Sequence, residues 1–460
     1  MSVLNTIRIG QTGLNAASAG IEVTGHNVAN ANTDGYHART LGTSASSTVN
    51  QSGMWFGQGT AISEVARAGD ELVSSQLVES QGESAFQSSL YETLSVVEAM
   101  FSETDGSGLA TTLADFFDSL EAATLDPSDD SLRTGVLSAA DDLAGSVGST
   151  YAFLDNTAAS VEGQIEQSLD SINEAIAQIA ALQESISSDA ASIGQGDLLD
   201  QRDALVSELA ASIGATVDYG EGSEITLYLG AHALVNDTAA RTLSYGTDTD
   251  GNPVISISAD AGSYEVTSSV GGAVGGLLAS HDTIRDVQAD LDSFAETFAD
   301  AFNAQHAAGY DANGSAGGAV FSYTTGSAAS SFAVDASLAA DTDLLALAGA
   351  STASAGDGGN LTALIDIQDS EIFDSGTKTA EDFVSSIYTT IGQQVASASA
   401  AHESANATTS DLESLYASIT GVDLDTQAVE LIQWQAAYQA AARVISAGDQ
   451  MLSELMDMAR

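Results

Sequence analysis

The stretch from Gly421 to Met458 decides how this chain folds, and it reads GVDLDTQAVELIQWQAAYQAAARVISAGDQMLSELMDM. Two rows of residues recur along it at heptad spacing, the second row three places after the first. The first row is Leu424, Leu431, Tyr438, Ile445 and Leu452, and the second row is Gln427, Trp434, Ala441, Gly448 and Leu455. This spacing is typical of a coiled-coil helix. Alanines flank both rows, which favours a bundle over an isolated pair of helices.

The apolar stripe on this helix is too large to stay in water. Burial of one Leu, Ile or aromatic side chain contributes roughly 1.5–3 kcal/mol, so the large side chains of the stripe together represent about 10 kcal/mol. That is as much as the net stability of many whole domains. The stripe is therefore covered by another part of this chain or by another chain, or it stays disordered until assembly.

A second seam of the same kind lies at the other end of the chain, in residues 3–32. Its heptad positions are Ile7, Leu14, Ile21 and Val28. Both seams are predicted to act in assembly. The simplest way to bury them is for the two ends to pair, so we predict one terminal coiled-coil domain from residues 1–33 and 421–460.

The N-terminal seam runs into the motif VTGHNVANANTDGY, from Val23 to Tyr36. Asn30 and Asn32 are poor helix formers that tolerate left-handed geometry, and the following Asp-Gly pair supplies a turn. We therefore expect the helix to end near Asn32. The Ser/Thr/Gly-rich residues after it predict an extended linker at 34–69.

Helical periodicity returns in three further segments. Apolar residues at steps of three and four predict a helical bundle domain built from both halves of the chain, from residues 70–214, 271–308 and 361–420. Within it we expect a loop from Asp105 to Gly108. Between Asp129 and Ser192 we expect one very long helix or two nearly collinear helices.

A two-residue period replaces the helical one in the middle of the sequence. It predicts a small β domain at 215–270. Residues 309–360 are rich in Gly, Ala and Ser and predict a loop or a β-rich insertion with short strands near Val320 and Phe332. The predicted fold is mainly α with a small β insertion: a terminal coiled coil, a bundle of long helices and an outward β domain.

The chain is strongly acidic. It carries 10 Lys and Arg against 64 Asp and Glu, a formal net charge of −54, and Lys378 is its one lysine. Nucleic acids and anionic membranes attract clustered positive charge, so we expect neither as a partner. Such an acidic surface keeps a protein soluble in high salt and indicates a saline habitat. There is no cysteine, which excludes disulfides and thiolate chemistry.

Targeting signals are not evident in the sequence. The first residues lack the basic region and apolar run of a secretory signal peptide, and no apolar stretch reaches the roughly 18 residues that a membrane span needs. We expect the protein to be cytoplasmic or to leave the cell without a cleaved signal.

Several short motifs resemble sites that bind ions or phosphate. Asp248 to Asn252 and Asp311 to Gly314 place oxygen ligands before a glycine, as calcium loops do, but both lack the closing glutamate, which favours plain turns. The glycine run at 271–276 lacks the lysine of a phosphate-binding loop and favours a flexible junction. The six histidines are scattered, and no nucleophile elbow occurs. We predict no cofactor, no metal site and no enzyme activity.

The motif from Val23 to Tyr36 resembles the N-terminal signature of flagellar rod, hook and hook-associated proteins. Its signature residues in this chain are Asn27, Asn30, Asn32, Thr33, Gly35 and Tyr36. Similarity to the hook-associated protein 1 branch of that family rests on four further stretches. They are Asp197-Leu-Leu-Asp-Gln-Arg-Asp-Ala-Leu205, Gly275-Gly-Leu-Leu278, Phe302-Asn-Ala-Gln-His-Ala-Ala-Gly-Tyr-Asp311, and Gly421-Val-Asp-Leu-Asp425 leading into Tyr438-Gln-Ala-Ala-Ala-Arg-Val-Ile445. The chain departs from the signature at Asp34, usually proline, and at His37-Ala-Arg39, usually Ser-Arg-Gln.

The resemblance implies a structural protein of the bacterial flagellum. Such a protein leaves the cell unfolded through the flagellar type III export apparatus, with an export chaperone on its C-terminal region. Outside the cell it forms a ring of its own subunits at the hook-filament junction, between the hook protein and hook-associated protein 3. The terminal coiled coil would then line the channel.

Two other functions fit parts of the sequence. A hook-type axial protein shares the two terminal motifs, but the stretches at 197–205 and 302–311 argue against it. A secreted coiled-coil adhesin or translocator would use the β domain to bind a ligand. That hypothesis predicts that removal of 215–270 abolishes the adhesion or translocation phenotype while motility persists.

Overall fold

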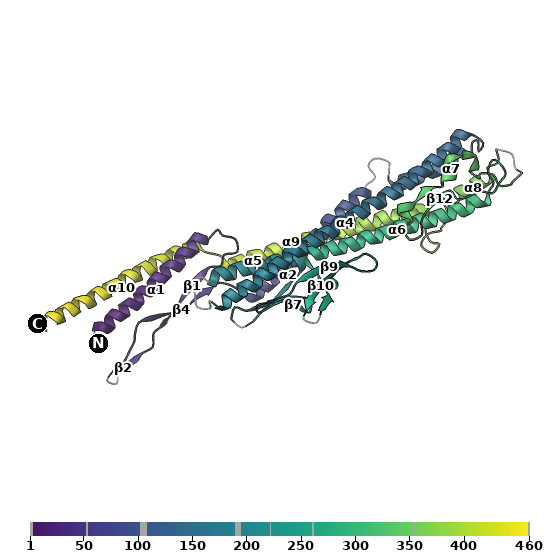
Figure 1. Ribbon diagram of the computed structural model, residues 1–460. Helices are drawn as coiled ribbons and strands as arrows, with labels where there is room; N and C mark the ends of the chain where they lie inside the picture. The colour runs from purple at the N-terminus through teal and green to yellow at the C-terminus, as the bar shows by residue number, and fades with distance from the viewer. Residues whose placement is uncertain are drawn as a thin grey trace.

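The computed structural model describes residues 3–51, 54–101, 108–188, 195–220, 222–259, 262–352 and 356–458. The molecule is long and narrow (Figure 1). Both ends of the chain lie together at one end of it, and the middle of the sequence reaches the other end. We call residues 70–420 the rod, and residues 1–69 and 421–460 the terminal part. None of the helices in this part of the chain combines the length and the apolarity that a bilayer crossing needs.

The two ends of the chain pair with each other. Helix α1 (Val3–Asn30) lies along α10 (Leu424–Met458) at the left of Figure 1. Helix α10 begins at a side-chain cap, because the Asp423 carboxylate accepts hydrogen bonds from the Asp425 backbone N–H at 3.0 Å and the Thr426 hydroxyl at 2.8 Å. Such a cap satisfies donors that the first helical turn leaves unpaired.

The segment at 34–69, for which we predict an extended linker, contains two antiparallel strand pairs that form a long hairpin. Strand β1 (Arg39–Ala45) is antiparallel to β4 (Thr60–Arg67), and β2 (Val49–Gln51) is antiparallel to β3 (Met54–Phe56). This hairpin is tied to α1, where the Thr12 hydroxyl oxygen accepts a hydrogen bond of 3.2 Å from the backbone N–H of Thr60. Its outer end, at β2 and β3, projects away from the helix pair (Figure 1).

The rod is built from helices of both halves of the chain. They are α2 (Glu71–Phe101), α3 (Leu109–Ala123), α4 (Asp130–Ser188), α5 (Gln195–Ile213), α6 (Gly272–Ala308) and α9 (Ala380–Thr420). Helix α2 packs against α9, α6 and α5, and α4 packs against α3, α6 and α5. Of the two alternatives for the long segment, one continuous helix of 59 residues is found. Residues 189–192 of that segment and 105–107 of the expected loop lie outside the described residues.

Phenylalanines form the centre of the core where α3 meets α6. The ring of Phe116 lies edge-on to Phe298, with 6.0 Å between the centroids, and Phe298 stacks on Phe294 at 5.5 Å. All three side chains are fully buried. On α6 the apolar residues recur every three or four positions, which turns one face of the helix toward α3 and α4. Aromatic pairs of this kind contribute about 0.5–1.5 kcal/mol beyond their area burial.

Two small antiparallel sheets lie along the side of the rod, between α5 and α6 in sequence. One has the strand order β5-β6-β7-β8 and the other β11-β10-β9. The strands are β5 (Thr216–Tyr219), β6 (Ile225–Leu229), β7 (His232–Asn236), β8 (Ala239–Ala240), β9 (Leu243–Thr247), β10 (Pro253–Ala259) and β11 (Gly262–Glu265), followed by the 3-10 helix η1 (Thr267–Ser269). The inward side chains of β6 and β10 join the same core as the helices. The predicted fold class, mainly α with a small β insertion, is confirmed.

The far end of the rod holds short elements that connect α6 to α9. They are β12 (Phe321–Ser322), η2 (Ala329–Ser331), β13 (Ala333–Val334), α7 (Ala336–Ala340), η3 (Thr342–Leu344) and α8 (Gly359–Ile365). The two strands lie where short strands are predicted, but helical turns contribute more residues than strands. Fully buried His306 ties this region to α6: its Nδ1 donates to the Gly318 carbonyl at 2.8 Å, and its Nε2 accepts from the Ala346 N–H at 2.8 Å.

The glycine run at 271–276 is a site of close packing, so the expectation of a flexible junction is wrong. A Cβ atom added to Gly276 would stand 2.3 Å from the backbone carbonyl oxygen of Phe86 on α2. Any residue larger than glycine would therefore push α6 away from α2.

The two candidate calcium loops are engaged in turns. Asp248 Oδ1 accepts hydrogen bonds from the backbone N–H groups of Asp250 and Asn252, both at 2.8 Å. Asp311 Oδ1 accepts from two backbone N–H groups of its own turn in the same way. These carboxylates fix the turns, as the favoured interpretation expects.

Candidate functional site

The terminal helices are held in antiparallel register by large side chains that sit against glycines. Ile7 of α1 lies against Gly448 of α10, and Trp434 of α10 lies against Gly20 of α1. A Cβ atom added to Gly20 would stand 2.3 Å from the indole ring of Trp434. Residues near the start of α1 therefore contact the C-terminal half of α10, and residues farther along α1 contact its N-terminal half. The small residues of both seams let the two backbones approach closely.

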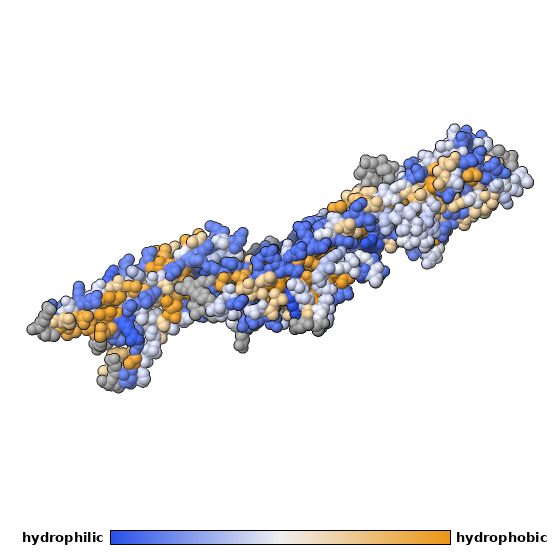
Figure 2. All heavy atoms as spheres, in the orientation of Figure 1, coloured by the Kyte–Doolittle hydropathy of each residue, from blue (hydrophilic) through white to orange (hydrophobic). Residues whose placement is uncertain are grey.

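Pairing leaves much of the predicted assembly seam open to solvent. The residues Ile7, Leu14, Ile21, Leu431, Trp434, Ala441 and Ile445 are partly covered, whereas Val28, Leu424, Tyr438, Leu452 and Leu455 remain exposed. Leu424 keeps 52 % and Leu455 keeps 49 % of its surface in solvent. On α10 the buried residues are Gln427 and Gly448. Figure 2 shows apolar surface over this end of the molecule, with smaller apolar patches along the rest of it. One partner helix therefore covers one side of the stripe.

Asn27, the centre of the N-terminal motif, connects three segments of the chain. Its Nδ2 donates to the Arg39 carbonyl at 2.8 Å and to Gln427 Oε1 of α10 at 2.9 Å. Its Oδ1 accepts from the Arg39 N–H at 3.0 Å and from the Tyr36 hydroxyl at 2.7 Å. The side chain is fully buried, and these four bonds use its whole donor and acceptor capacity. The amide therefore fixes how α1, the hairpin and α10 meet.

The other motif residues make the turn that follows α1. The backbone N–H of Thr33 donates to the Asn30 carbonyl at 2.9 Å, and the N–H of Tyr36 donates to the Thr33 carbonyl at 3.2 Å. Gly35 has a φ of 73°, a conformation that glycine adopts without strain. Asn32 is exposed. The motif thus returns the chain from α1 to β1.

A cluster of ion pairs joins the base of the hairpin to α5, and we call it the joint. It consists of His37, Arg39 and Arg67 from the hairpin and of Asp197, Asp200 and Asp203 from α5. Arg39 contacts Asp197 and Asp200, while Arg67 Nε lies 2.7 Å from Asp200 and its Nη1 lies 2.7 Å from Asp203. The Arg39 side chain is only 4 % exposed, so its charge depends on these partners.

His37 adds a second helix, α9, to the joint. Its Nδ1 lies 2.7 Å from Asp200 Oδ1, and its Nε2 lies 2.8 Å from the Tyr416 hydroxyl on α9. The backbone N–H of the next residue, Ala38, donates to the Thr420 carbonyl at the end of α9, at 2.8 Å. The hairpin base therefore contacts both α5 and α9 just before the chain enters α10.

The pKa values of the joint follow from this geometry. Burial alone would raise the pKa of the Asp200 carboxyl, but the hydrogen bond with His37 and the charge of Arg67 outweigh it, and the pKa is lowered. Burial would lower the pKa of Arg67, and the charges of Asp203 and Asp200 raise it instead. Burial raises the pKa of the Tyr416 hydroxyl. The Asp200 carboxylate and the Arg67 guanidinium group therefore stay ionised together at neutral pH.

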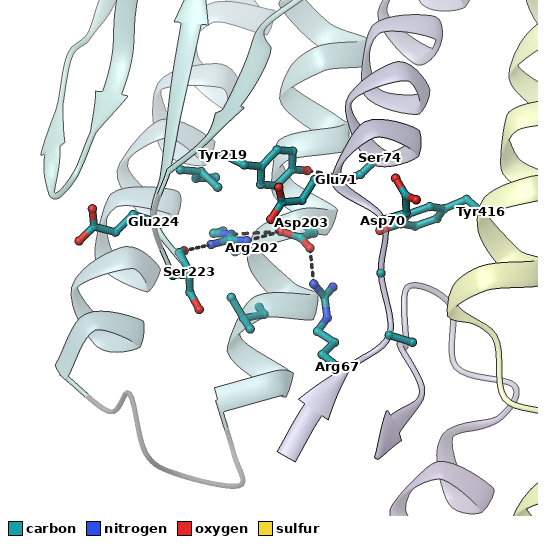
Figure 3. A pocket seen from close by; sticks show the side chains of 15 residues that line it. Arg67, Asp70, Glu71, Ser74, Arg202, Asp203, Tyr219, Ser223, Glu224 and Tyr416 are labelled. Atoms are coloured by element: carbon teal, nitrogen blue, oxygen red, sulfur yellow. Dashed lines mark hydrogen bonds and ion pairs between the residues drawn. The ribbon is translucent and has the colours of Figure 1, made fainter. Parts of the chain in front are cut away.

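A cavity of about 240 Å³ lies beside the joint (Figure 3). Both arginines in its wall, Arg67 and Arg202, contact Asp203, and Arg202 also donates to the Ser223 carbonyl at 2.6 Å. Across the described residues, no group of three or more His, Asp or Glu side chains is placed to hold a metal ion. The charged side chains in this wall hold the hairpin, α5 and the β region together.

The joint is not among the sites predicted from the sequence, although two signals point to it. Three of the chain's ten basic residues lie in or beside it: Arg39 and Arg67 belong to the joint, and Arg202 contacts Asp203. Asp197, Asp200 and Asp203 recur every three positions, which places them on one face of a helix. In a chain with 64 acidic residues, the scarce arginines are the better guide to a specific ion pair.

Comparison with known proteins gives three family matches along this architecture. The model for the flagellar hook-associated protein FlgK helical domain matches residues 94–321. The model for the flagella basal body rod protein matches 7–37, and that for the flagellar basal body rod FlgEFG protein C-terminal matches 414–458. By these matches the chain resembles FlgK-type hook-associated proteins of the flagellum. The terminal helix pair thus corresponds to the two matches with basal body rod proteins. Most of residues 70–420 corresponds to the helical-domain match.

The relatives are hook-associated proteins 1 from several bacteria. The Escherichia coli (strain K12) protein is 30 % identical over 320 residues, 66 % of this chain and 58 % of that protein. The Salmonella typhimurium protein is 30 % identical over 325 residues, 68 % of this chain and 58 % of that protein. The Bacillus subtilis (strain 168) protein is 25 % identical over 489 residues, 96 % of each chain. The matches thus span just over half of the two enterobacterial relatives.

A solved structure shares the fold. It is the flagellar hook junction protein FlgK from Burkholderia pseudomallei, with a TM-score of 0.67 and 18 % sequence identity. The match covers 75 % of this chain and all of that chain. At this level of identity the likeness concerns the architecture alone.

Proposed function

We propose that this chain is a structural subunit of the hook-filament junction of a bacterial flagellum. The observation that supports the proposal most is the terminal helix pair, whose apolar stripe is half open after the two helices have paired. A ring of identical subunits would place further helices against that stripe, and small residues in both seams would let them approach closely. Similarity to hook-associated proteins 1 supports the same role. The role is structural and requires no catalytic centre.

The proposed partners follow from that position. Copies of the chain would form the ring, with the hook protein on one side and hook-associated protein 3 on the other. Before assembly the chain would pass unfolded through the flagellar type III export apparatus, with an export chaperone on its C-terminal region. A chain without cysteine suits this route, because no disulfide would hinder threading. The mature location would be extracellular, at the flagellum.

Deletion of the gene in its own bacterium tests the proposal. Electron microscopy should find hooks without filaments, and flagellin should accumulate in the medium. Normal filaments on the deletion strain would refute the junction role.

A second experiment tests the assembly seam inside the full chain. Ile445→Asp places a charge in the contact with Gly10 of α1 and should block incorporation at the hook tip while the rod stays folded and exported. Leu431→Asp should act in the same way. Gln439→Asp, an exposed change outside both heptad rows on the same helix, is the matched control and should restore filaments to the deletion strain. If Ile445→Asp also restores them, another surface carries assembly.

A further inference from the structure

The apolar core of the rod does not extend into the terminal part. Its members lie between Val78 and Val395 in the sequence, and none of them comes from the described residues of the terminal part. Among the described residues, no helix or strand of the terminal part packs extensively against one of the rod, whereas α1 and α10 pack along each other. Burial of apolar surface therefore does not fix the angle between the two parts.

The ion pairs of the joint connect the two parts instead. Asp197, Asp200 and Asp203 follow one another at intervals of three residues on α5, which places the three carboxylates on one side of the helix. The guanidinium groups of Arg39 and Arg67 lie against that side, and both contact Asp200. Two arginines of the hairpin are thus held by three carboxylates of the rod.

The backbone leaves the terminal part free to turn where the chain crosses into the rod. It crosses twice, after Gly69 and before Gly421, and glycine adopts a wider range of backbone angles than any other residue. A Cβ atom added to Gly69 would meet no atom within 4 Å. Gly69 and Asp203 also both line the cavity of about 240 Å³ beside the joint (Figure 3). Side-chain contacts, rather than tight packing at these crossings, must therefore set the angle.

The two arginines depend on the carboxylates, because both are largely shut off from water. The side chain of Arg39 is 4 % exposed and that of Arg67 is 18 % exposed. Arg39 lies so close to the first turn of α5 that a Cβ atom added to Gly196 would stand 2.6 Å from its Nε. Without the carboxylates, two buried cations would face each other unpaired. They regain hydration when the hairpin moves away from α5.

We propose that the three aspartates of α5 are positioning residues, which hold the terminal part at one angle to the rod. Without Asp197, Asp200 and Asp203, the terminal part turns about Gly69 and Gly421. This inference goes beyond the proposed function: it gives a role to the acidic stretch at the start of α5 and identifies what sets the geometry between the two parts of one subunit.

Single-molecule energy transfer between two dyes on the full chain tests the proposal. The chain has no cysteine, so Gln76→Cys on α2 and Gln439→Cys on α10, both at exposed positions, each carry one dye. The native chain should give one narrow distance distribution. Replacing Asp197, Asp200 and Asp203 together by asparagine should broaden it to roughly twice the native width, as a released hinge does. An equally narrow distribution in this variant, or a native distribution as broad as that of the variant, would overturn the proposal.

Two controls separate turning from other causes. Asp141→Asn, Asp142→Asn and Asp170→Asn together remove the same charge from exposed positions on α4 and should leave the distribution narrow. Broadening by this set as well would overturn the specific role of the joint. Hydrogen exchange of the amides in α1 and α6 should be the same in the α5 variant as in the native chain. Faster exchange in either helix would show that unfolding broadens the distribution, and it would overturn the proposal too.

Gly196→Ala tests the geometry while every charge stays in place. The added methyl group displaces the Arg39 guanidinium from α5, so the distribution should broaden, although less than when the three carboxylates are removed. Gly163→Ala on α4, where a Cβ atom meets nothing within 4 Å, is the matched control and should keep the native width. An equal width in both alanine variants would contradict the role of the Arg39 contact. These outcomes are independent of the junction role: a chain that restores filaments to the deletion strain, but whose triple asparagine variant keeps the narrow distribution, overturns this inference alone.

Discussion

Helices α6 and α10 are nearly equal in length, yet they are buried to very different degrees. Of the 37 residues of α6, seventeen are buried, including Phe294, Phe298 and Phe302. Of the 35 residues of α10, two are buried. Both helices carry an apolar stripe, so the difference comes from their surroundings. Within the described residues, α6 packs against several helices, whereas α10 packs mainly against α1. The rod is thus complete as a single chain, and the terminal part is not.

The largest expected effect is in the rod. Phe298 is fully buried among other phenylalanine rings, so Phe298→Ala removes a ring and leaves a cavity. We expect the free energy of unfolding of the rod to fall by about 3–5 kcal/mol. Chemical denaturation followed by circular dichroism measures it.

The control for this change is on α10. Ile432→Ala removes a side chain that is 66 % exposed and should change the free energy of unfolding of the single chain by less than about 0.5 kcal/mol. A large loss with Ile432→Ala would mean that the terminal part is folded against more of the chain than α1.

The next effect is in the terminal helix pair. Gly20→Ala puts a methyl group into the indole ring of Trp434, where a Cβ would stand 2.3 Å away. The helices must separate, and we expect the pair to lose about 1–3 kcal/mol, as overpacked sites do. Hydrogen exchange of the α1 amides should accelerate, while exchange in the rod stays unchanged.

Gly25 provides a matched control on the same helix. A Cβ at Gly25 meets no atom within 4 Å, so Gly25→Ala should slow exchange in α1 by raising its helix propensity by up to about 1 kcal/mol. If both alanine variants accelerate exchange equally, the loss at Gly20 does not come from close packing against Trp434.

The joint links the rod to the terminal part, and loss of one of its charges should have a smaller effect on the free energy of unfolding. Asp200→Asn removes the carboxylate shared by Arg39 and Arg67 and should cost about 1–2 kcal/mol. Because the pKa of Asp200 is lowered in the folded chain, its contribution is fully present above the unfolded value of about 3.9 and is lost as the pH falls below it. Unfolding measured at pH 7 and pH 3 should therefore differ less in Asp200→Asn than in the native chain.

Exposed Asp170 on α4 is the control for the joint. Asp170→Asn should leave both the stability at pH 7 and its loss at pH 3 as they are in the native chain. The same result for Asp200→Asn would mean that the ion pairs of the joint contribute nothing measurable, as many exposed pairs do.

The sequence predicted the elements of both regions well, because heptad and three-to-four spacings depend only on local geometry. The C-terminal end of α1 and both ends of α4 fall within a few residues of the positions expected. Pairing of the two ends was predictable too, since two open seams need partners. The joint was not, because its partners come from distant segments: Arg39 and Asp197 are 158 residues apart. The close contact of Gly276 with α2 was missed for the same reason, since glycine marks both flexible and crowded backbone.

The smallest expected effect is at the far end of the rod, where His306 is buried between Gly318 and Ala346. A carbonyl oxygen only accepts and a backbone N–H only donates, so the imidazole is neutral with its proton on Nδ1. Burial lowers the pKa of His306. Its contribution to stability is therefore fully present above the unfolded value of about 6.5 and is lost as the pH falls through it. Between pH 7.5 and pH 5.5, roughly one unit either side of that value, thermal unfolding of His306→Gln should change less than that of the native chain. An identical change in both would mean that His306 does not set the acid sensitivity of the rod.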